Sequence, residues 1–218
     1  RTLLSSLPGA AITEIKIKNI SHEFSTLPGV QEDMIALSLN FKKLCFRVHV
    51  DEPQVLPLKV KGEKEVTASM IKTNTNVEII NPDEVIAHLT AKDAEIDIEV
   101  RVERGLGYSA VESRKSEGRL PIGTIAIDAL FTPVVKVNYT IENMRVGDRT
   151  DYNRIRLEIE TDGSITPSSA LHKAGNILKD HFEQISAVAV TESESPPASG
   201  AVEEGEKEPK KKSRSKKQ

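Results

Sequence analysis

The side chains with the widest chemical range in this sequence are five histidines: His22, His49, His88, His172 and His181. Histidine acts as an acid or base near neutral pH and binds metal ions through a ring nitrogen. None of the five stands at a metal-ligand spacing from Cys, Asp or Glu. His49 and His88 fall in alternating strand patterns, where a structural role is the simpler interpretation. The histidines therefore predict neither a catalytic site nor a metal site.

Other short patterns also fall short of known catalytic motifs. Residues 103–108 contain Gly-x-Gly but lack the third glycine and following helix of a dinucleotide-binding loop, so they predict a turn. The sequence has no phosphate-binding Gly-x-x-x-x-Gly-Lys, no Gly-x-Ser-x-Gly and no Asp-x-Asp-x-Asp cluster that would hold catalytic metal ions. We predict no catalytic residue, no metal and no cofactor. An unrecognised site among the strand carboxylates is the rival hypothesis.

Composition sets the broad class. The chain has 218 residues, enough for one large domain or two small ones, and its net charge of −3 shows no basic excess typical of nucleic-acid-binding proteins. A single cysteine, Cys45, cannot form an intramolecular disulfide. No signal peptide is visible, and no apolar run reaches the roughly 18 residues that span a membrane. These features predict a reducing cytosol.

The most informative stretch is 22–44, because it joins a loop to a helix that is apolar on two sides. The turn-forming residues Ser25, Thr26, Pro28 and Gly29 predict a loop in its first half. Glu32 and Asp33 are assigned to the first helical turn, where acidic side chains suit the helix dipole. Ile35 and Leu39 lie away from the main apolar face, so we expect the helix to be covered on two sides, which favours docking over ordinary core packing. The main face consists of Met34, Leu37, Phe41 and Leu44.

Short alternating segments between residues 9 and 136 predict a mainly antiparallel β region. Turns recur at intervals of roughly 8–12 residues, as in a sandwich or barrel-like unit. Upstream of it, residues 1–7 predict the end of a helix already under way, terminated by Pro8 and Gly9. The polar segment 109–120 predicts a mobile loop, and 147–153 predicts a charged turn between two long strands.

The last predicted helix begins near Thr166, a good N-cap, with Pro167 at its first position. Its apolar stripe continues for about five turns, and Gly175 permits close approach of another backbone. From periodicity alone, packing on the chain's own sheet and packing on a second subunit are equally good interpretations. The stripe consists of Leu171, Ala174, Leu178, Phe182 and Ile185.

Residues 191–218 change character and predict a disordered tail. The first part is acidic and the last part, from residue 207, is basic, with no core-forming content. Two interpretations stay open: a solvated tail without a specific role, and a weak, salt-sensitive contact with DNA or RNA.

Six ordered stretches resemble the N-terminal, assembly domain of the bacterial RNA polymerase alpha subunit, and the resemblance covers about residues 1–186. An ordered series of this kind is more specific than any single short motif. The stretches are HEFSTLPGVQEDMIALSLNFK (22–42), RTLLSSLPGAAITEIKI (1–17), VERGLGY (102–108), PIGTIAIDALFTPVVKVNY (121–139), RVGDRTDYNRIRLEIETDGSITP (145–167) and SALHKAGNIL (169–178).

The resemblance implies an α+β fold of two subdomains. Residues 1–8 and 137–190 are expected to form a dimerisation subdomain of two helices packed on a sheet, and residues 9–136 an inserted, mainly antiparallel β subdomain. In the family a strand and most of a helix precede the equivalent of residue 1, and a helical DNA-binding domain follows the tail. We therefore expect a fragment at the N-terminus; the sequence does not contain this C-terminal domain, and whether the protein has one stays open.

The resemblance also implies the function. The alpha subunit carries no catalytic residue of the nucleotidyltransferase; it homodimerises and provides the platform for the β and β′ subunits, with ω and sigma in the holoenzyme. Contact with DNA is expected to be indirect, through the tail if at all, and contact with a membrane is not expected. Similar subunits occur in plastids, so the source is open between a bacterial cytoplasm and a plastid.

Two sets of site residues follow from the resemblance. This chain has Gly147 and Asp148 where family members often have another pair, so no contact is assigned to these two. The expected dimer interface is Leu3, Leu171, Ala174, Leu178, Phe182 and Ile185. The expected large-subunit contacts are Arg1, His22, Glu23, Phe24, Ser25, Gly29, Val30, Glu32, Asp33, Arg145, Arg149, Thr150 and Asp151.

Overall fold

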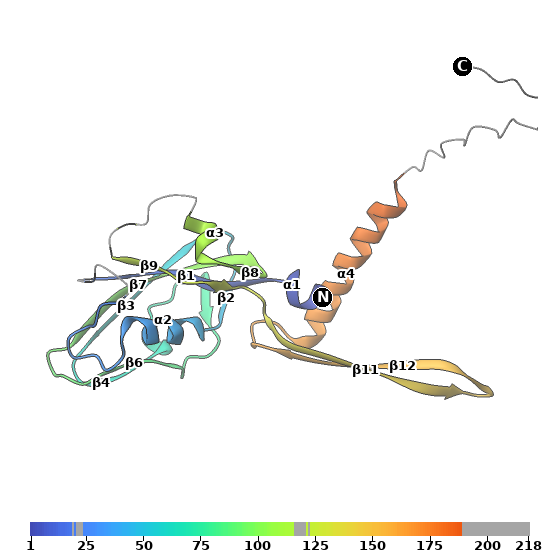
Figure 1. Cartoon of the computed structure of the whole chain (residues 1–218), viewed down its shortest axis with the longest axis horizontal. Helices are drawn as coiled ribbons and strands as arrows, with labels where there is room; N and C mark the ends of the chain where they lie inside the picture. Colours follow the sequence, from blue (N-terminus) through green and yellow to red (C-terminus); the bar gives the residue numbers. More distant parts are fainter. Residues whose placement is uncertain (19, 21–23, 116–120, 122, 189–218) are drawn as a thin grey trace, which may run out of the picture.

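The fold consists of a β-rich body from which a long hairpin and a long helix extend (Figure 1). A computed structural model describes residues 1–18, 20, 24–115, 121 and 123–188. The helices are α1 (Thr2–Ser5), α2 (Met34–Lys42), the 3-10 helix η1 (Ala68–Met70), α3 (Val111–Lys115) and α4 (Pro167–Ser186). The strands are β1 (Pro8–Ile17), β2 (Phe46–Val48), β3 (Gln54–Lys61), β4 (Lys64–Thr67), β5 (Val77–Ile79), β6 (Val85–Leu89), β7 (Glu95–Leu106), β8 (Tyr108–Ser109), β9 (Thr124–Ala126), β10 (Ala129–Leu130), β11 (Val134–Val146) and β12 (Arg149–Thr161).

The body is organised around a four-stranded antiparallel sheet with the order β3-β7-β1-β9. Residues 96, 98, 100 and 102 of β7 are buried and their neighbours are more exposed, as the alternation in the sequence predicted. Ribbons β2–β5, β4–β6 and β8–β10 surround this sheet. Among the described residues β3 and β9 are its edges, so the sheet does not close into a barrel.

Helix α2 fills the body because one of its faces carries large apolar side chains. Met34, Leu37 and Phe41 are buried in the main core, together with Leu44 just after the helix. These side chains contact the inner surfaces of β1 and β6. The predicted apolar face of this helix is confirmed.

A second, smaller hydrophobic cluster lies outside the body, where α1 and α4 pack at the base of the β11–β12 hairpin. Leu7, Val134, Ala170 and Ala174 are buried in this cluster. Around them lie the partly buried Leu3, Val137, Ile159, Ile165 and Ile177.

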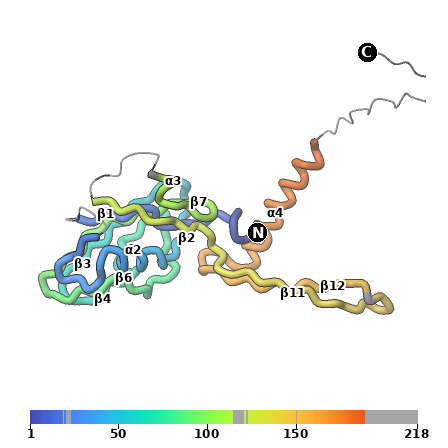
Figure 2. The backbone as a smooth tube through the Cα atoms, in the orientation of Figure 1, coloured from blue at the N-terminus to red at the C-terminus, as the bar shows by residue number. Residues whose placement is uncertain are grey.

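The hairpin and α4 leave this cluster in different directions (Figures 1 and 2). β11 and β12 pair antiparallel from Val134 and Thr161 to Val146 and Arg149. A tight turn joins them at Gly147, whose φ of 62° lies in the left-handed region that favours glycine.

The α+β class and the mainly antiparallel pairing are confirmed, and three local predictions are wrong. Pro8 and Gly9 begin β1 rather than ending a helix: a Cβ at Gly9 would lie 1.8 Å from the carbonyl oxygen of Phe131, so glycine permits close packing here. In the predicted loop 109–120, residues 111–115 form helix α3, because the Asp128 carboxylate accepts the amide of Val111 at 3.0 Å; residues 116–120 lie outside the described residues. The segment 149–153 belongs to β12, since a tight turn already closes the hairpin.

Candidate partner-binding surfaces

Helix α4 presents an apolar seam that its own chain leaves uncovered. Leu171, Leu178, Phe182 and Ile185 are between 45% and 67% exposed. Gly175 lies between the first two, and a Cβ on it would meet nothing within 4 Å. These five residues, at spacings of 4, 3, 4 and 3, are called the α4 seam below. Alternating steps of three and four are the spacing with which one helix packs along another.

The other two predicted dimer residues lie differently. Ala174 is 4% exposed and sits in the second cluster, and Leu3 is partly buried against the same cluster. Both residues therefore pack in or against the second hydrophobic cluster, beneath α4, and do not line the exposed seam. Thr166 and Pro167 determine the residue at which α4 begins. The Thr166 hydroxyl accepts the amide of Ser169 at 3.3 Å, and Pro167 occupies the first helical position. The predicted N-cap is confirmed.

The loop that precedes α2 is tied to strand β6 by its backbone. Val30 forms a β-bridge with Leu89, and the Gly29 carbonyl accepts the amide of Thr90 at 2.9 Å. Gly29 has a φ of 77°, and a Cβ there would lie 2.8 Å from that of Ala94, so its backbone needs glycine. Ser25 lies next to Phe24, whose side chain is 73% exposed.

The placement of the two acidic residues in the first turn of α2 is wrong. Asp33 is the N-cap: its carboxylate accepts the amide of Ala36 at 2.7 Å, because the helix begins only at Met34. Glu32 lies before the helix and turns to His88 on β6. Its Oε2 accepts the backbone amide of His88 at 2.8 Å, and its Oε1 lies 2.6 Å from the His88 Nδ1.

This pair shifts both protonation equilibria. Burial would raise the pKa of Glu32, but the hydrogen bonds from the His88 ring and backbone outweigh it, so the pKa lies below the ordinary 4.5. The hydrogen bond to Glu32 raises the pKa of His88 above 6.5, and the charge of Glu65, 3.8 Å from Nε2, acts in the same direction. His88 is thus structural, as predicted for a strand histidine, and joins the loop to the sheet.

The pairing predicts a pH window for the loop. The contribution of Glu32 is present above its unfolded pKa of 4.5 and is lost as pH falls through its lower folded pKa. The contribution of His88 is present below its unfolded pKa of 6.5 and is lost as pH rises through its higher folded pKa. The Gln31 amide donates to the His88 carbonyl. We expect this amide to be best protected from hydrogen exchange between pH 4.5 and 6.5, where both contributions are present.

The measurement is exchange of Gln31 against pH, corrected for the intrinsic rate, in the parent chain and in His88→Gln. The variant should lose the decrease in protection above pH 6.5, because glutamine does not titrate. Identical profiles for the two proteins would show that the ring contributes nothing to holding the loop.

The second apolar face of α2 is not covered by any described residue. Ile35 and Leu39 are exposed and line a groove of about 350 Å³, with Phe24 and the buried Met34 beside them. The opposite wall comes from β9 and α3, and Lys42 lies 3.7 Å from Asp128 across one end. We name this the α2 groove. Its lining is Phe24, Met34, Ile35, Ser38, Leu39, Lys42, Val111, Ile125, Ala126, Ile127 and Asp128.

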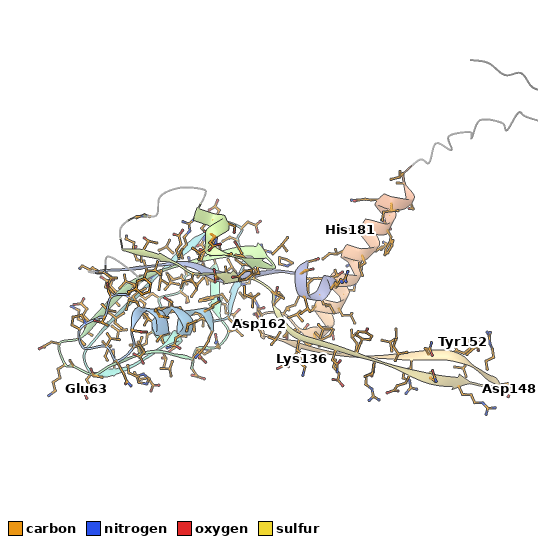
Figure 3. All side chains as sticks on the ribbon, viewed as in Figure 1. Glu63, Lys136, Asp148, Tyr152, Asp162 and His181 are labelled. Carbon is orange, nitrogen blue, oxygen red and sulfur yellow. The ribbon has the colours of Figure 1, made fainter. Side chains whose placement is uncertain are left out.

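The predicted charged contact lies at the tip of the hairpin, far from the body, where Figure 3 labels Asp148 and Tyr152. Arg149 pairs with Asp151 at 2.7 Å and stacks over the Tyr152 ring at 5.1 Å. This pairing with Arg149 lowers the pKa of Asp151. Arg145 donates to the Gly147 carbonyl at 2.7 Å.

The structure brings the predicted contact residues into three separate places rather than one site. Arg1 lies exposed at the start of α1, apart from both the α2 groove and the hairpin tip. His22, Glu23 and the tail 191–218 lie outside the described residues, as does the side chain of Thr150.

One apolar surface was not predicted from the sequence. Along the hairpin, Tyr139 pairs with Leu157 and Ile141 with Ile155, so these four side chains share one face, and all are exposed. The register that joins β12 to β11 is needed to find this continuous apolar face.

Other chemistry is limited in the described part. Cys45 is half-buried, and this burial, with the nearby charges of Asp162 and Glu84, raises the pKa of its thiol. In the described ranges no three His, Cys, Asp or Glu side chains gather as a possible metal site. No helix there has a stretch long and apolar enough to cross a membrane.

The fold and these surfaces define an α+β protein whose exposed apolar side chains gather on a helix seam, a groove and a hairpin face, the pattern of a protein that binds other proteins. A sequence profile described as the RNA polymerase Rpb3/RpoA insert domain matches residues 15–132, over half of the chain. The chain belongs to this family, that of the RNA polymerase alpha subunit.

Curated relatives agree with the profile. The chain is 50% identical over 183 residues to the DNA-directed RNA polymerase subunit alpha of Symbiobacterium thermophilum, and 49% identical over 182 residues to that of Moorella thermoacetica. Each alignment covers 84% of this chain and 58% of the relative. The subunit alpha of Aquifex aeolicus is 47% identical over 205 residues, 94% of this chain and 64% of the relative. The chain thus spans about three fifths of the length of these relatives.

Proposed function

We propose that this chain is a non-catalytic subunit of DNA-directed RNA polymerase that homodimerises and serves as the assembly platform for β and β′. The observation that carries the proposal is the α4 seam, because four large apolar side chains stand exposed at a helix-pairing spacing. Fully burying an exposed side chain of this kind is worth roughly 1.5–3 kcal/mol, and each of the four is about half exposed, so a second copy laid along the seam gains about half of that for each. Family membership supports the same assignment.

The large subunits are proposed to contact the α2 groove with its loop, the N-terminal Arg1 and the hairpin tip. Exposed apolar side chains rimmed by the Lys42–Asp128 pair are typical of a protein-binding surface. Residues 1–8 with 137–190 are proposed as the dimerisation subdomain, and 9–136 as the inserted subdomain. In this proposal the chain acts in the cytoplasm with ω and sigma, and reaches DNA only through its partners or its tail.

The test has three readouts on the purified full chain. Light scattering should give the mass of a dimer, affinity capture should retain added β and β′ subunits, and the chain alone should not turn over nucleotides. A stable monomer that ignores both large subunits contradicts the proposal. Nucleotide turnover or metal-dependent activity by the chain alone would instead favour the rival hypothesis of an enzyme with an unrecognised carboxylate site.

A further inference from the structure

Hydrogen bonds from Arg47 join the turn between β12 and α4 to the β-rich body. Arg47 stands on β2, and its Nε donates to the carbonyl of Ser164 at 2.9 Å. Its Nη2 donates to the carbonyl of Gly163 at 3.0 Å. A single guanidinium therefore donates to two successive carbonyls of the turn. The planar, rigid guanidinium of arginine can make this pair of bonds, whereas the ammonium group of lysine lacks the geometry for it.

A third contact sets the direction of that guanidinium. Glu78 on β5 is the cross-strand neighbour of Arg47 in the β2–β5 ribbon. Its Oε2 lies 2.8 Å from the Arg47 Nη1. The Glu78 carboxylate, which belongs to the body, thus orients the guanidinium, and the two carbonyls of the turn accept its remaining hydrogen bonds.

The turn is shaped to meet this donor. The Asp162 carboxylate accepts the amide of Ser164 at 2.8 Å, and the amide of Asp162 donates to Pro133 at 3.1 Å. Gly163 has a φ of 88°, and a Cβ on it would lie 2.9 Å from the Cγ2 of Ile80 in the body. Close packing on Ile80 and the bonds from Arg47 therefore fix the same residue from two sides.

Thr166, the N-cap of α4, follows Ser164 by only two residues. The orientation of this turn therefore determines the direction in which α4 starts. Figure 3 labels Asp162 at the junction between the body and the hairpin, with Glu63 and His181 at far ends of the body and of α4. A small rotation at the junction consequently produces a large displacement along α4.

We infer that Arg47 is a positioning residue that fixes the direction of α4 and the hairpin relative to the body. Its role is to hold the α4 seam and the α2 groove at one mutual angle, so that a dimer presents both grooves in a defined geometry. This inference rests on the proposed function for its consequence in assembly, but the angle itself is a property of the chain alone.

The experiment measures that angle with spin labels at Glu63→Cys and Asp180→Cys, two exposed positions, in a Cys45→Ser background. Labelled chain is diluted with unlabelled chain so that only distances within one copy are seen. The parent should give a narrow distance distribution, and Arg47→Ala a broader or shifted one. Arg47→Lys should fall between them, since lysine keeps the charge but not the two-carbonyl geometry.

Assembly provides the second readout. Capture of β and β′ by Arg47→Ala should weaken by at least about tenfold, because both charge-assisted bonds to the turn are lost and each is worth about that factor or more, while dimerisation by the seam persists. Arg156→Ala is the matched control, because Arg156 pairs with Glu142 within the hairpin at 3.8 Å and does not reach the body. It should leave both the distances and the capture unchanged.

Two outcomes overturn the inference: a distance distribution in Arg47→Ala that matches the parent, or equal broadening in Arg156→Ala. If Arg47→Ala does not fold, Glu78→Gln removes only the orienting charge and should still broaden the distribution; an unchanged distribution there also overturns it. A parent chain that neither dimerises nor captures β and β′, with Arg47→Ala still broadened, contradicts the proposed function and leaves Arg47 as the residue that fixes the angle.

Discussion

A Leu178→Asp variant is expected to be monomeric at concentrations where the parent chain forms the proposed dimer. Leu178 lies in the middle of the α4 seam and is 45% exposed in a single copy. In a twofold contact the substitution occurs twice, and each copy loses apolar burial and brings a carboxylate into the interface. We expect a loss of on the order of 3–6 kcal/mol, or about 10²–10⁴-fold in the dimerisation constant.

Sedimentation velocity over a concentration series measures this change. Asn176→Asp is the matched control, because it adds the same charge to an exposed position of α4 outside the seam. Circular dichroism should show that both variants keep the helix content of the parent. A Leu178→Asp chain that stays dimeric would show that the copies do not meet along this seam.

The second large effect is expected at Phe41, on the inner face of α2. Phe41 is fully buried in the main core, so Phe41→Ala should lower the free energy of unfolding by about 3–5 kcal/mol. This is a large fraction of the stability of an ordinary domain. Urea denaturation followed by circular dichroism measures it, and capture of the large subunits should fall only in parallel with the folded fraction.

Leu39→Ala tests the outer face of α2 separately from the inner face that carries Phe41. Leu39 is 57% exposed and lines the α2 groove, so its truncation should change stability by less than about 0.5 kcal/mol. If the groove binds a large subunit, this variant nonetheless captures β or β′ more weakly than the parent. A Leu39→Ala chain with parental capture, or a large loss of stability in it, would contradict the assignment of this face to partner binding.

Local patterns in the sequence predicted those elements whose signals are short-range. The apolar face of α2 and the Thr166–Pro167 start of α4 follow from spacing and capping alone, and both are confirmed. Which α4 residues face outward could not be predicted from spacing, because the neighbouring positions 174 and 175 both fit an apolar stripe of period 3.6. Burial of Ala174 against Ala170 and Leu7 leaves Gly175, rather than Ala174, facing outward.

The remaining features depend on contacts between residues distant in sequence. The α2 groove joins residues 34–42 to 111–128, and Arg47 meets Ser164 across 117 positions. Neither pairing leaves a periodic signal, so the sequence could not reveal them. Glu32 illustrates the same limit: its spacing suited the helix dipole, but the nearby ring and amide of His88 determine where its carboxylate lies.

The β11–β12 hairpin has a consequence for the handling of the newly made chain. It is a two-stranded sheet in the described structure, so each thirteen-residue strand has an open edge, beside an exposed apolar face. Open edges of this length are templates for strand pairing with another molecule. Copies synthesised in excess of the proposed partners are therefore expected to aggregate or to be degraded, which would favour matched synthesis rates of this chain and those partners.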